Sequence, residues 1–351
     1  MKNPVVAVTG LNATDSPGPG VPILRSLKES SLNPRLIGFC YDVLEPGNFM
    51  DLVENSFILP YPNTGAQELL SRIQYIHSQI KIDVIMPCLD SELDNYIALQ
   101  GELQKMGIQT FLPSKEQLHT RDKSVLKEKL ENTNVLIPET ITIQDTSAIK
   151  LAAEKLGFPM LVKGLFYEAY LAYSIEEAIG WFYRLASKWG YPIILQKFIQ
   201  GEECNVIALG HEGNTLGAVV MKKLFLTDKG KAWAGVTIDN AEAKKTSFEI
   251  LKFIGWNGGC ELEYIIEKGT GKMYLLEINP RFPAWVYLAT ASGMNLPEAQ
   301  LQLSLGQKTN LPSSYKVGQV FVRHSWDDII TLEQIENLST IGELKAKANS
   351  V

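Results

Sequence analysis

The sequence predicts an α/β protein that starts with a doubly wound parallel sheet and continues into mixed α+β lobes. Up to about residue 112, short continuous apolar runs alternate with helical segments. Such runs are typical of parallel strands, which are buried on both faces. Later segments instead pair strands around turns at residues 210–214 and 268–272, as antiparallel hairpins do.

Length, composition and charge narrow the class of protein. The chain has 351 residues, 45% of them hydrophobic and 21% charged, which is enough to build more than one lobe. The net charge is −6 with no basic block, so we expect no nucleic-acid partner. There is no signal peptide pattern and no long apolar run, so we expect a cytoplasmic protein without membrane contact. Four dispersed cysteines are expected to be buried thiols in a reducing cytosol: Cys40, Cys88, Cys204 and Cys260.

The N-terminal region follows a strand–loop–helix alternation. The first strand is predicted at residues 4–9, followed by a loop rich in glycine and proline. This loop lacks GxGxxG, so it does not indicate a dinucleotide site. The remaining strands are predicted at 35–40, 56–59, 83–87 and 109–112, and the helices at 21–29, 64–79 and 91–106.

Two loops leave the carboxyl ends of these strands, at residues 12–20 and 88–92. Ligands of doubly wound sheets bind at those ends, so both loops are candidates for lining a substrate site. The alternative is that they are plain turns, in which Asp90 and Ser91 cap the following helix.

The middle of the chain predicts a smaller mixed lobe and then a larger one. A helix begins near Ser114, and Ser174 with Glu177 forms a capping box. The other predicted helices are 148–156, 175–188 and 244–253, and the strands are 160–163, 192–199, 204–209 and 215–221. Toward the C-terminus we expect helices at 286–292, 297–305 and 331–346 and a strand at 319–324.

The stretch GGCELEYIIEKGTGKMYLLEINPR carries the strongest chemical signal. Glu263 lies on the first strand of this hairpin, and Glu277 and Asn279 share one face of the second. Three oxygen-bearing side chains suit Mg²⁺, with Mn²⁺ as an alternative, and the phosphates of a substrate usually complete such a site. Arg281 adds a planar cation for an anionic oxygen.

This stretch, with LATASGMNLPEAQLQLSLGQ after it, resembles the metal-binding end of the ATP-grasp superfamily. The likeness is closest to the branch of carbamoyl-phosphate synthetase, biotin carboxylase and carboxylate–amine ligases. It implies an ATP-grasp fold behind an N-terminal α/β domain, with divisions at residues 1–112, 113–195, 196–310 and 311–351. It also implies that Glu263, Glu277 and Asn279 hold magnesium and that Arg281 faces the transferred phosphoryl group or acyl phosphate.

The resemblance implies further ATP contacts. Lys123 and Lys163 would reach the phosphates, and Glu203 would accept a hydrogen bond from the ribose. Gln196, with the backbone of Lys197 to Ile199, would meet the adenine edge. In the basic stretch 221–235, Lys222 or Lys223 is expected, with Lys231, to bind phosphate or a substrate carboxylate; the alternative is a solvated loop.

The segment after Lys163 departs from the family. Relatives have a flexible loop rich in glycine and serine there, whereas residues 164–173 hold one glycine and several aromatic residues. These aromatic residues either cover the nucleotide or an apolar substrate, or pack in the lobe's own core. Phe282 and Trp285 leave the same choice between an acceptor pocket and simple packing.

The resemblance implies an ATP- and Mg²⁺-dependent ligase that joins a small-molecule or peptide carboxylate to an amine through an acyl phosphate, with a homodimer as one arrangement. A first alternative is a subunit that binds ATP without turnover, which the segment after Lys163 favours. A second is activation of bicarbonate or carbamate. The chain is much shorter than a whole carbamoyl-phosphate synthetase, so we do not expect that enzyme.

Overall fold

The chain forms two compact units in the computed structural model, which describes residues 3–14, 16–121, 126–131, 133–164, 168–227 and 230–345. Unit 1 consists of Met1–Leu118, Asn205–Glu261 and Ile278–Val351. Unit 2 consists of His119–Cys204 and Leu262–Glu277. The four-part division expected from the sequence is finer than this and stays a prediction.

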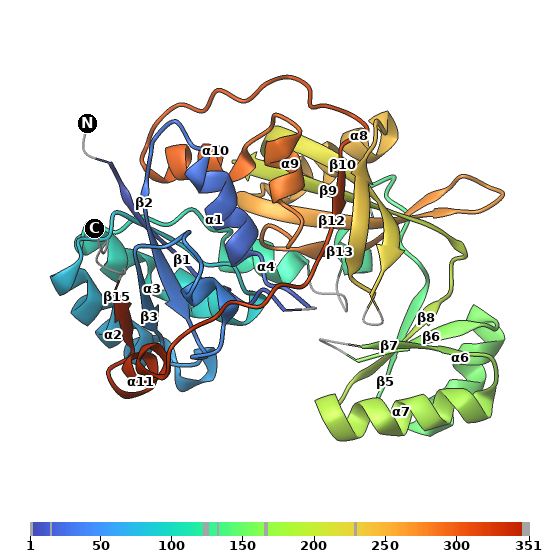
Figure 1. Ribbon diagram of the computed structural model, residues 1–351. Helices are drawn as coiled ribbons and strands as arrows, with labels where there is room; N and C mark the ends of the chain where they lie inside the picture. The colour runs from blue at the N-terminus through green and yellow to red at the C-terminus, as the bar shows by residue number, and fades with distance from the viewer. Residues whose placement is uncertain are drawn as a thin grey trace. The chain divides into compact units, whose positions relative to one another are not determined.

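A five-stranded sheet in the order β15-β3-β2-β1-β4 opens unit 1 (Figure 1). β1 pairs in parallel with β2 and β4, and β2 pairs in parallel with β3, as the apolar runs predict. These strands are β1 (Val5–Val8), β2 (Arg35–Cys40), β3 (Asn55–Ile58) and β4 (Val84–Met86).

Helices cover both faces of this sheet, so it is doubly wound. On one face, Val6 and Val8 pack with α1 (Gly20–Lys28). On the other, Val5 and Ala7 pack with α2 (Ala66–Gln79) and α3 (Leu93–Lys105). Alternate residues of a strand point to opposite faces, and a strand buried on both sides therefore needs an unbroken apolar run.

Two expectations for this sheet are wrong. The strand predicted at 109–112 is a single parallel bridge between Val84 and Gln109, because the chain then leaves the sheet and Phe111 packs against His211. The helix predicted at 331–346 stops early: α11 (Leu332–Thr340) is followed by Gly342 with φ of 70° and by β15 (Glu343–Lys345). β15 pairs antiparallel with β3 and forms the edge of the sheet.

The larger sheet has six strands in the order β13-β12-β9-β10-β11-β14. β10 pairs antiparallel with β11, and β11 with β14. The strands are β9 (Gly201–His211), β10 (Asn214–Leu226), β11 (Ala232–Thr237), β12 (Gly258–Glu267), β13 (Met273–Asn279) and β14 (Val320–Val322). The helices after β11 are α8 (Ala241–Ile254), α9 (Tyr287–Ala291) and α10 (Leu296–Ser304), and α9 and α10 lie beside α1 (Figure 1).

Unit 2 contains an antiparallel sheet in the order β5-β8-β6-β7. Its strands are β5 (Thr140–Ile143), β6 (Met160–Lys163), β7 (Ala169–Ala172) and β8 (Ile193–Lys197). α6 (Ile149–Leu156) and α7 (Ile175–Trp189) bury their apolar sides on one face of it, as Figure 1 shows. The short helices α4 (Lys115–Thr120) and α5 (Leu126–Lys129) come earlier in the chain.

All four cysteines are buried and free, as expected. Burial raises the pKa of the Cys204 thiol to about 12 and also raises the pKa values of the other three thiols. Among the described helices, none is both long and apolar enough to cross a lipid bilayer.

The start of α1 requires glycine, because a Cβ at Gly20 would lie 2.1 Å from the carbonyl oxygen of Thr9 at the end of β1. We expect Gly20→Ala to lower the free energy of unfolding by about 1–3 kcal/mol, as overpacked sites do. The matched control is Gly101→Ala in α3, where a Cβ would meet nothing within 4 Å. That substitution should stabilise by roughly 0.5–1 kcal/mol, since alanine is the better helix former. Urea unfolding measures both, and equal effects would contradict the steric explanation.

Candidate functional site

A buried carboxylate organises the unit 1 end of the predicted metal hairpin. Glu261 is 4% exposed. Its Oε1 accepts hydrogen bonds from Asn205 Nδ2 at 2.9 Å and Trp285 Nε1 at 2.6 Å. Its Oε2 accepts one from Asn279 Nδ2 at 3.1 Å. The three donors come from β9, β13 and the loop after β13, so Glu261 joins three segments of the chain.

This network fixes the side chain of Asn279. Because the amide nitrogen of Asn279 donates to Glu261, the amide oxygen of Asn279 is on the other side of the amide group, directed away from that hydrogen bond. Side chains that bind metal ions are usually oriented in this way, by a hydrogen bond to a neighbouring group. No role was predicted for Glu261 from the sequence, and its spacing of two residues from Glu263 on one strand was the available signal.

The two predicted glutamate ligands follow the same alternation along their strands. Glu263 is two residues beyond Glu261 on β12, and Glu277 is two residues before Asn279 on β13. Residues two apart on a strand share a face, and Glu261 and Asn279 are in contact. Cys260, Leu262 and Tyr264, which alternate with the glutamates, are at most 1% exposed.

In the described part of the chain, no three His, Cys, Asp or Glu side chains form a group that could hold a metal ion. The predicted set has two carboxylates and one amide, so this finding does not bear on it. The assignment of Glu263, Glu277 and Asn279 as metal ligands stays a prediction.

Arg281 lies beside the loop 88–92 of the N-terminal sheet. Its Nε is 3.1 Å from Asp90 Oδ1, and its Nη1 donates to the carbonyl oxygen of Phe282 at 3.3 Å. The pair joins the end of β13 to the carboxyl ends of the parallel strands. Sequence reasoning proposed both the loop and the arginine as site elements, but it did not predict their contact.

The loop that carries Asp90 is held by a second buried carboxylate, Glu92, which is 0% exposed. The hydroxyl groups of Thr9 and Tyr41 donate to it. The backbone N–H groups of Cys88 and Leu89 donate to Glu92 Oε1 at 2.7 Å and 2.9 Å. Burial raises the pKa of Glu92, and these four donors act against that rise.

In unit 2, the predicted phosphate lysine meets the predicted adenine-edge residue. Lys163 Nζ donates to Gln196 Oε1 at 2.7 Å, and Gln196 Nε2 donates to Thr140 Oγ1 at 3.1 Å. The amide orientation is therefore set from both ends. A neutral amide positions the ammonium group without cancelling its charge.

The other predicted nucleotide residues that the structure describes lie on β8, on β9 and in the connection between them. Lys197 ends β8 with an exposed side chain, Ile199 is buried, and Glu203 is on β9. Lys123 lies outside the described residues. These assignments stay predictions.

The basic stretch 221–235 is mainly strand. β10 runs on to Leu226, so Lys222 and Lys223 pair with β11 instead of standing in a loop. Being consecutive on a strand, they point to opposite faces, and only one of them can serve a given site. Lys231 lies just before β11, where the backbones of Thr227 and Lys231 hydrogen-bond.

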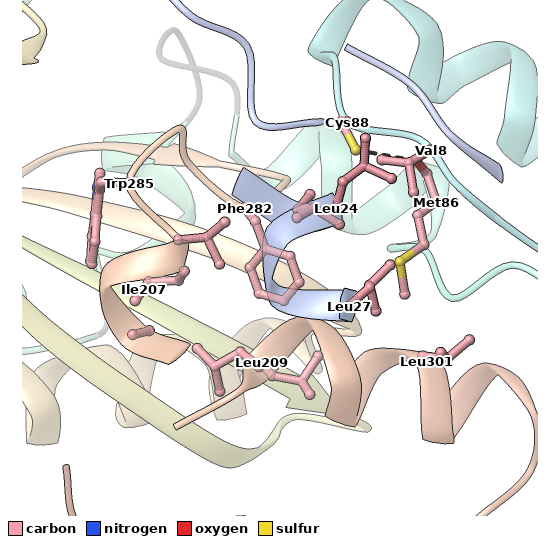
Figure 2. Close-up of a cluster of buried hydrophobic side chains, with 14 of the residues drawn as sticks. Val8, Leu24, Leu27, Met86, Cys88, Ile207, Leu209, Phe282, Trp285 and Leu301 are labelled. Atoms are coloured by element: carbon pink, nitrogen blue, oxygen red, sulfur yellow. Dashed lines mark hydrogen bonds between the residues drawn. The ribbon is translucent and has the colours of Figure 1, made fainter. Parts of the chain in front are cut away.

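Packing is the observed alternative for Phe282, Trp285 and Tyr170, whereas Tyr173 is 64% exposed and Phe166 and Tyr167 lie outside the described residues. Phe282 and Trp285 are 3% and 6% exposed, and Figure 2 shows the Phe282 ring beside Leu24 and Leu27 of α1. The cavity next to Phe282 and Arg281 holds only about 10 Å³, room for one water molecule. In unit 2, Tyr170 stacks on Trp181 with ring centroids 4.3 Å apart.

The chain has the ATP-grasp fold, as comparison with solved structures shows. The biotin carboxylase domain dimer of Hydrogenobacter thermophilus 2-oxoglutarate carboxylase, in complex with MgADP, ADP and bicarbonate, superposes with a TM-score of 0.68 and 16% identity. That match covers 90% of this chain and 73% of the other. An L-amino acid ligase from Bacillus licheniformis gives a TM-score of 0.64 at 15% identity, covering 87% and 75% of the two chains.

Comparisons of the sequence with known proteins indicate the same fold. Residues 191–323 match the family described as "ATP-grasp in the biosynthetic pathway with Ter operon". The carbamoyl phosphate synthase large chain of Clostridium botulinum is 25% identical over 232 residues, covering 61% of this chain. The match spans only 21% of that synthase, about a fifth of its length. The resemblance to the ATP-grasp superfamily is confirmed.

A tryptophan pair tests the Glu261 network. Trp285→Phe removes an indole N–H from a buried carboxylate, whereas Trp256→Phe removes a buried indole N–H that has no hydrogen-bond partner among the described residues. We expect Trp285→Phe to cost about 1–3 kcal/mol more in free energy of unfolding, the cost of leaving a buried polar group unsatisfied. Urea unfolding of both variants measures the difference, and equal losses would show that the bond to Glu261 contributes nothing.

Proposed function

We propose that this protein is an ATP- and Mg²⁺-dependent carboxylate–amine ligase, which forms an amide through an acyl phosphate and releases ADP and phosphate. The observation that carries the proposal is the hydrogen bond that orients Asn279 from Glu261, on the strand faces that also bear Glu263 and Glu277. A non-catalytic scaffold has no need of this arrangement. The similarity to an L-amino acid ligase and to a carbamoyl phosphate synthase supports the same class.

The side chains fit the expected metal. Carboxylate and amide oxygens are the hard ligands that Mg²⁺ prefers, and the Asn279 amide is oriented by its nitrogen. When bound, Mg²⁺ supplies positive charge that offsets the charge of the triphosphate.

Each remaining residue has a role set by its charge. Lys163, held by the neutral Gln196, offers its ammonium group to a phosphate oxygen. Arg281 offers a guanidinium group to the phosphoryl group or the acyl phosphate. We assign Lys231, with Lys222 or Lys223, to a phosphate or a substrate carboxylate. The reaction needs positioning and charge stabilisation and no covalent nucleophile, in keeping with four thiols whose pKa values burial raises.

The direct experiment is a screen for ADP release. The protein, with Mg²⁺ and ATP, is incubated with pairs of amino acids and short peptides, and products are identified by mass spectrometry. A ligase releases ADP only with a matching pair and forms the corresponding amide. ADP release that requires bicarbonate and no amine would instead support the carboxylase-like reaction.

Glu277→Gln should abolish turnover. The substitution keeps the size of the side chain and removes one negative charge from the predicted metal set. We expect kcat to fall by about a hundredfold or more, as when an electrostatic stabiliser of a transition state is removed. Glu267→Gln, at the far end of β12, is the control and should stay at the wild-type rate. A Glu277→Gln enzyme at wild-type rate would show that the metal set is misassigned.

Gln196→Glu tests the charge of Lys163. A carboxylate at this position would keep the contact of 2.7 Å and neutralise the ammonium group. We expect Kd for Mg-ATP to rise about tenfold, equivalent to about 1.4 kcal/mol. Isothermal titration calorimetry measures it, with Gln200→Glu as the exposed control. An unchanged affinity in Gln196→Glu would exclude Lys163 as a phosphate ligand.

A specific observation favours the non-catalytic alternative, in which ATP binds without turnover. β6 and β7 pair up to Lys163 and Ala169, and the Gly164 N–H donates to the Glu168 carbonyl oxygen at 3.1 Å. The connection between these strands comprises only residues 164–168, which is short for a phosphate-covering loop. Mg-ATP binding without ADP release for any substrate pair would support this function.

We also propose a cytoplasmic homodimer that acts on small-molecule or peptide substrates. The similar biotin carboxylase domain is described as a dimer. Light scattering coupled to size-exclusion chromatography measures the mass of this protein in solution.

A further inference from the structure

Asp90 is a carboxylate with unused hydrogen-bonding capacity beside the proposed catalytic arginine. Its Oδ1 lies 3.1 Å from Arg281 Nε and is buried. Within the described ranges this oxygen accepts no hydrogen bond of good geometry. The side chain is nevertheless 32% exposed, and because Oδ1 is buried this exposed area belongs to the rest of the side chain, which carries Oδ2.

The contact differs from that of an aspartate whose only task is to hold an arginine. Arginine and carboxylate usually pair through two parallel hydrogen bonds when the pair is structural. The Arg35–Glu54 pair is also held through two nitrogens, since Arg35 Nε and Nη2 both donate to Glu54 Oε2, at 2.9 Å and 2.7 Å. Among the described residues, Asp90 Oδ1 instead lies 3.1 Å from Arg281 Nε without a hydrogen bond of good geometry, and no hydrogen bond to Asp90 Oδ2 is formed.

The position of Asp90 is fixed before any substrate binds. Glu92, two residues on, is fully buried and accepts four hydrogen bonds from the ends of β1 and β2 and from the loop itself. A buried network with every donor satisfied holds its backbone rigidly. The loop also lies at the carboxyl ends of parallel strands, where ligands of such sheets bind.

We propose that Asp90 binds the amine substrate and accepts its proton during amide formation, an inference that rests on the ligase function proposed above. Arg281 and Asp90 then form a matched pair, in which the cation faces the acyl phosphate and the anion faces the amine. The amine nitrogen forms a bond to the acyl carbon. The bond from that carbon to the phosphate oxygen breaks, and phosphate leaves with the electron pair. The proton lost from nitrogen passes to Asp90 Oδ2, so atoms and charges balance.

The test compares two nucleophiles in wild type and Asp90→Asn. One is the amine of the best pair from the ADP-release screen, and the other is hydroxylamine, which is uncharged at neutral pH and attacks acyl phosphates without a base. Amide is measured by mass spectrometry and hydroxamate by its iron complex. We expect kcat/KM for the amine to fall about a hundredfold, the scale of general-base catalysis, while hydroxamate formation changes less than about threefold.

Two further variants control the comparison. Asp94→Asn, exposed on α3, should match wild type in both assays. Asp90→Glu retains the carboxylate and should recover part of the amine-dependent rate. Mg-ATP affinity equal to wild type confirms that each variant is folded.

The outcomes are distinct. Equal losses with both nucleophiles would mean that Asp90 only positions Arg281, and no loss with either would mean that it takes no part; both results overturn the inference while leaving the ligase function intact. A wild-type protein that forms neither ADP nor hydroxamate with any carboxylate overturns the ligase function, and the role of Asp90 falls with it.

Discussion

The hydrogen-bonded burial of Glu261 is the interaction on which the candidate site depends. A buried carboxylate is costly unless several donors satisfy it, and here three side-chain N–H groups do so. Because the donors belong to β9, β13 and the segment after β13, the carboxylate is satisfied only when all three segments are in place. The hydrogen bonds to Glu261 that stabilise this part of unit 1 thus also fix the orientation of the Asn279 amide.

Glu92 applies the same principle to the N-terminal sheet. Its donors come from the carboxyl ends of two parallel strands and from its own loop. Glu92 therefore connects these strand ends and the loop through buried hydrogen bonds. Removing the carboxylate of Glu261 or of Glu92 would leave several buried hydrogen-bond donors without an acceptor. Glu261 and Glu92 are both buried within hydrogen-bond networks, and each fixes the chain next to a proposed site residue: Asn279 in one case and Asp90 in the other.

Much of the local structure could be predicted from the sequence. Continuous apolar runs gave the parallel strands, and alternation in GGCELEYIIE and MYLLEIN gave a hairpin with its turn at Gly269 and Gly271, both of which have positive φ. The same alternation placed Glu277 and Asn279 on one strand face. Prediction was wrong at residues 343–345, because a three-residue edge strand has no periodicity of its own and forms only against β3.

The sequence alone determined which side chains carry oxygen and charge, their spacing along each strand and the fold class, since all of these follow from near neighbours in the chain. Only the tertiary structure decided that Glu261 binds Trp285 and Asn205, that Phe282 is buried, and that Arg281 meets Asp90. These contacts join residues far apart in the chain. They exist only once the sheets have formed and packed, and no local pattern encodes them.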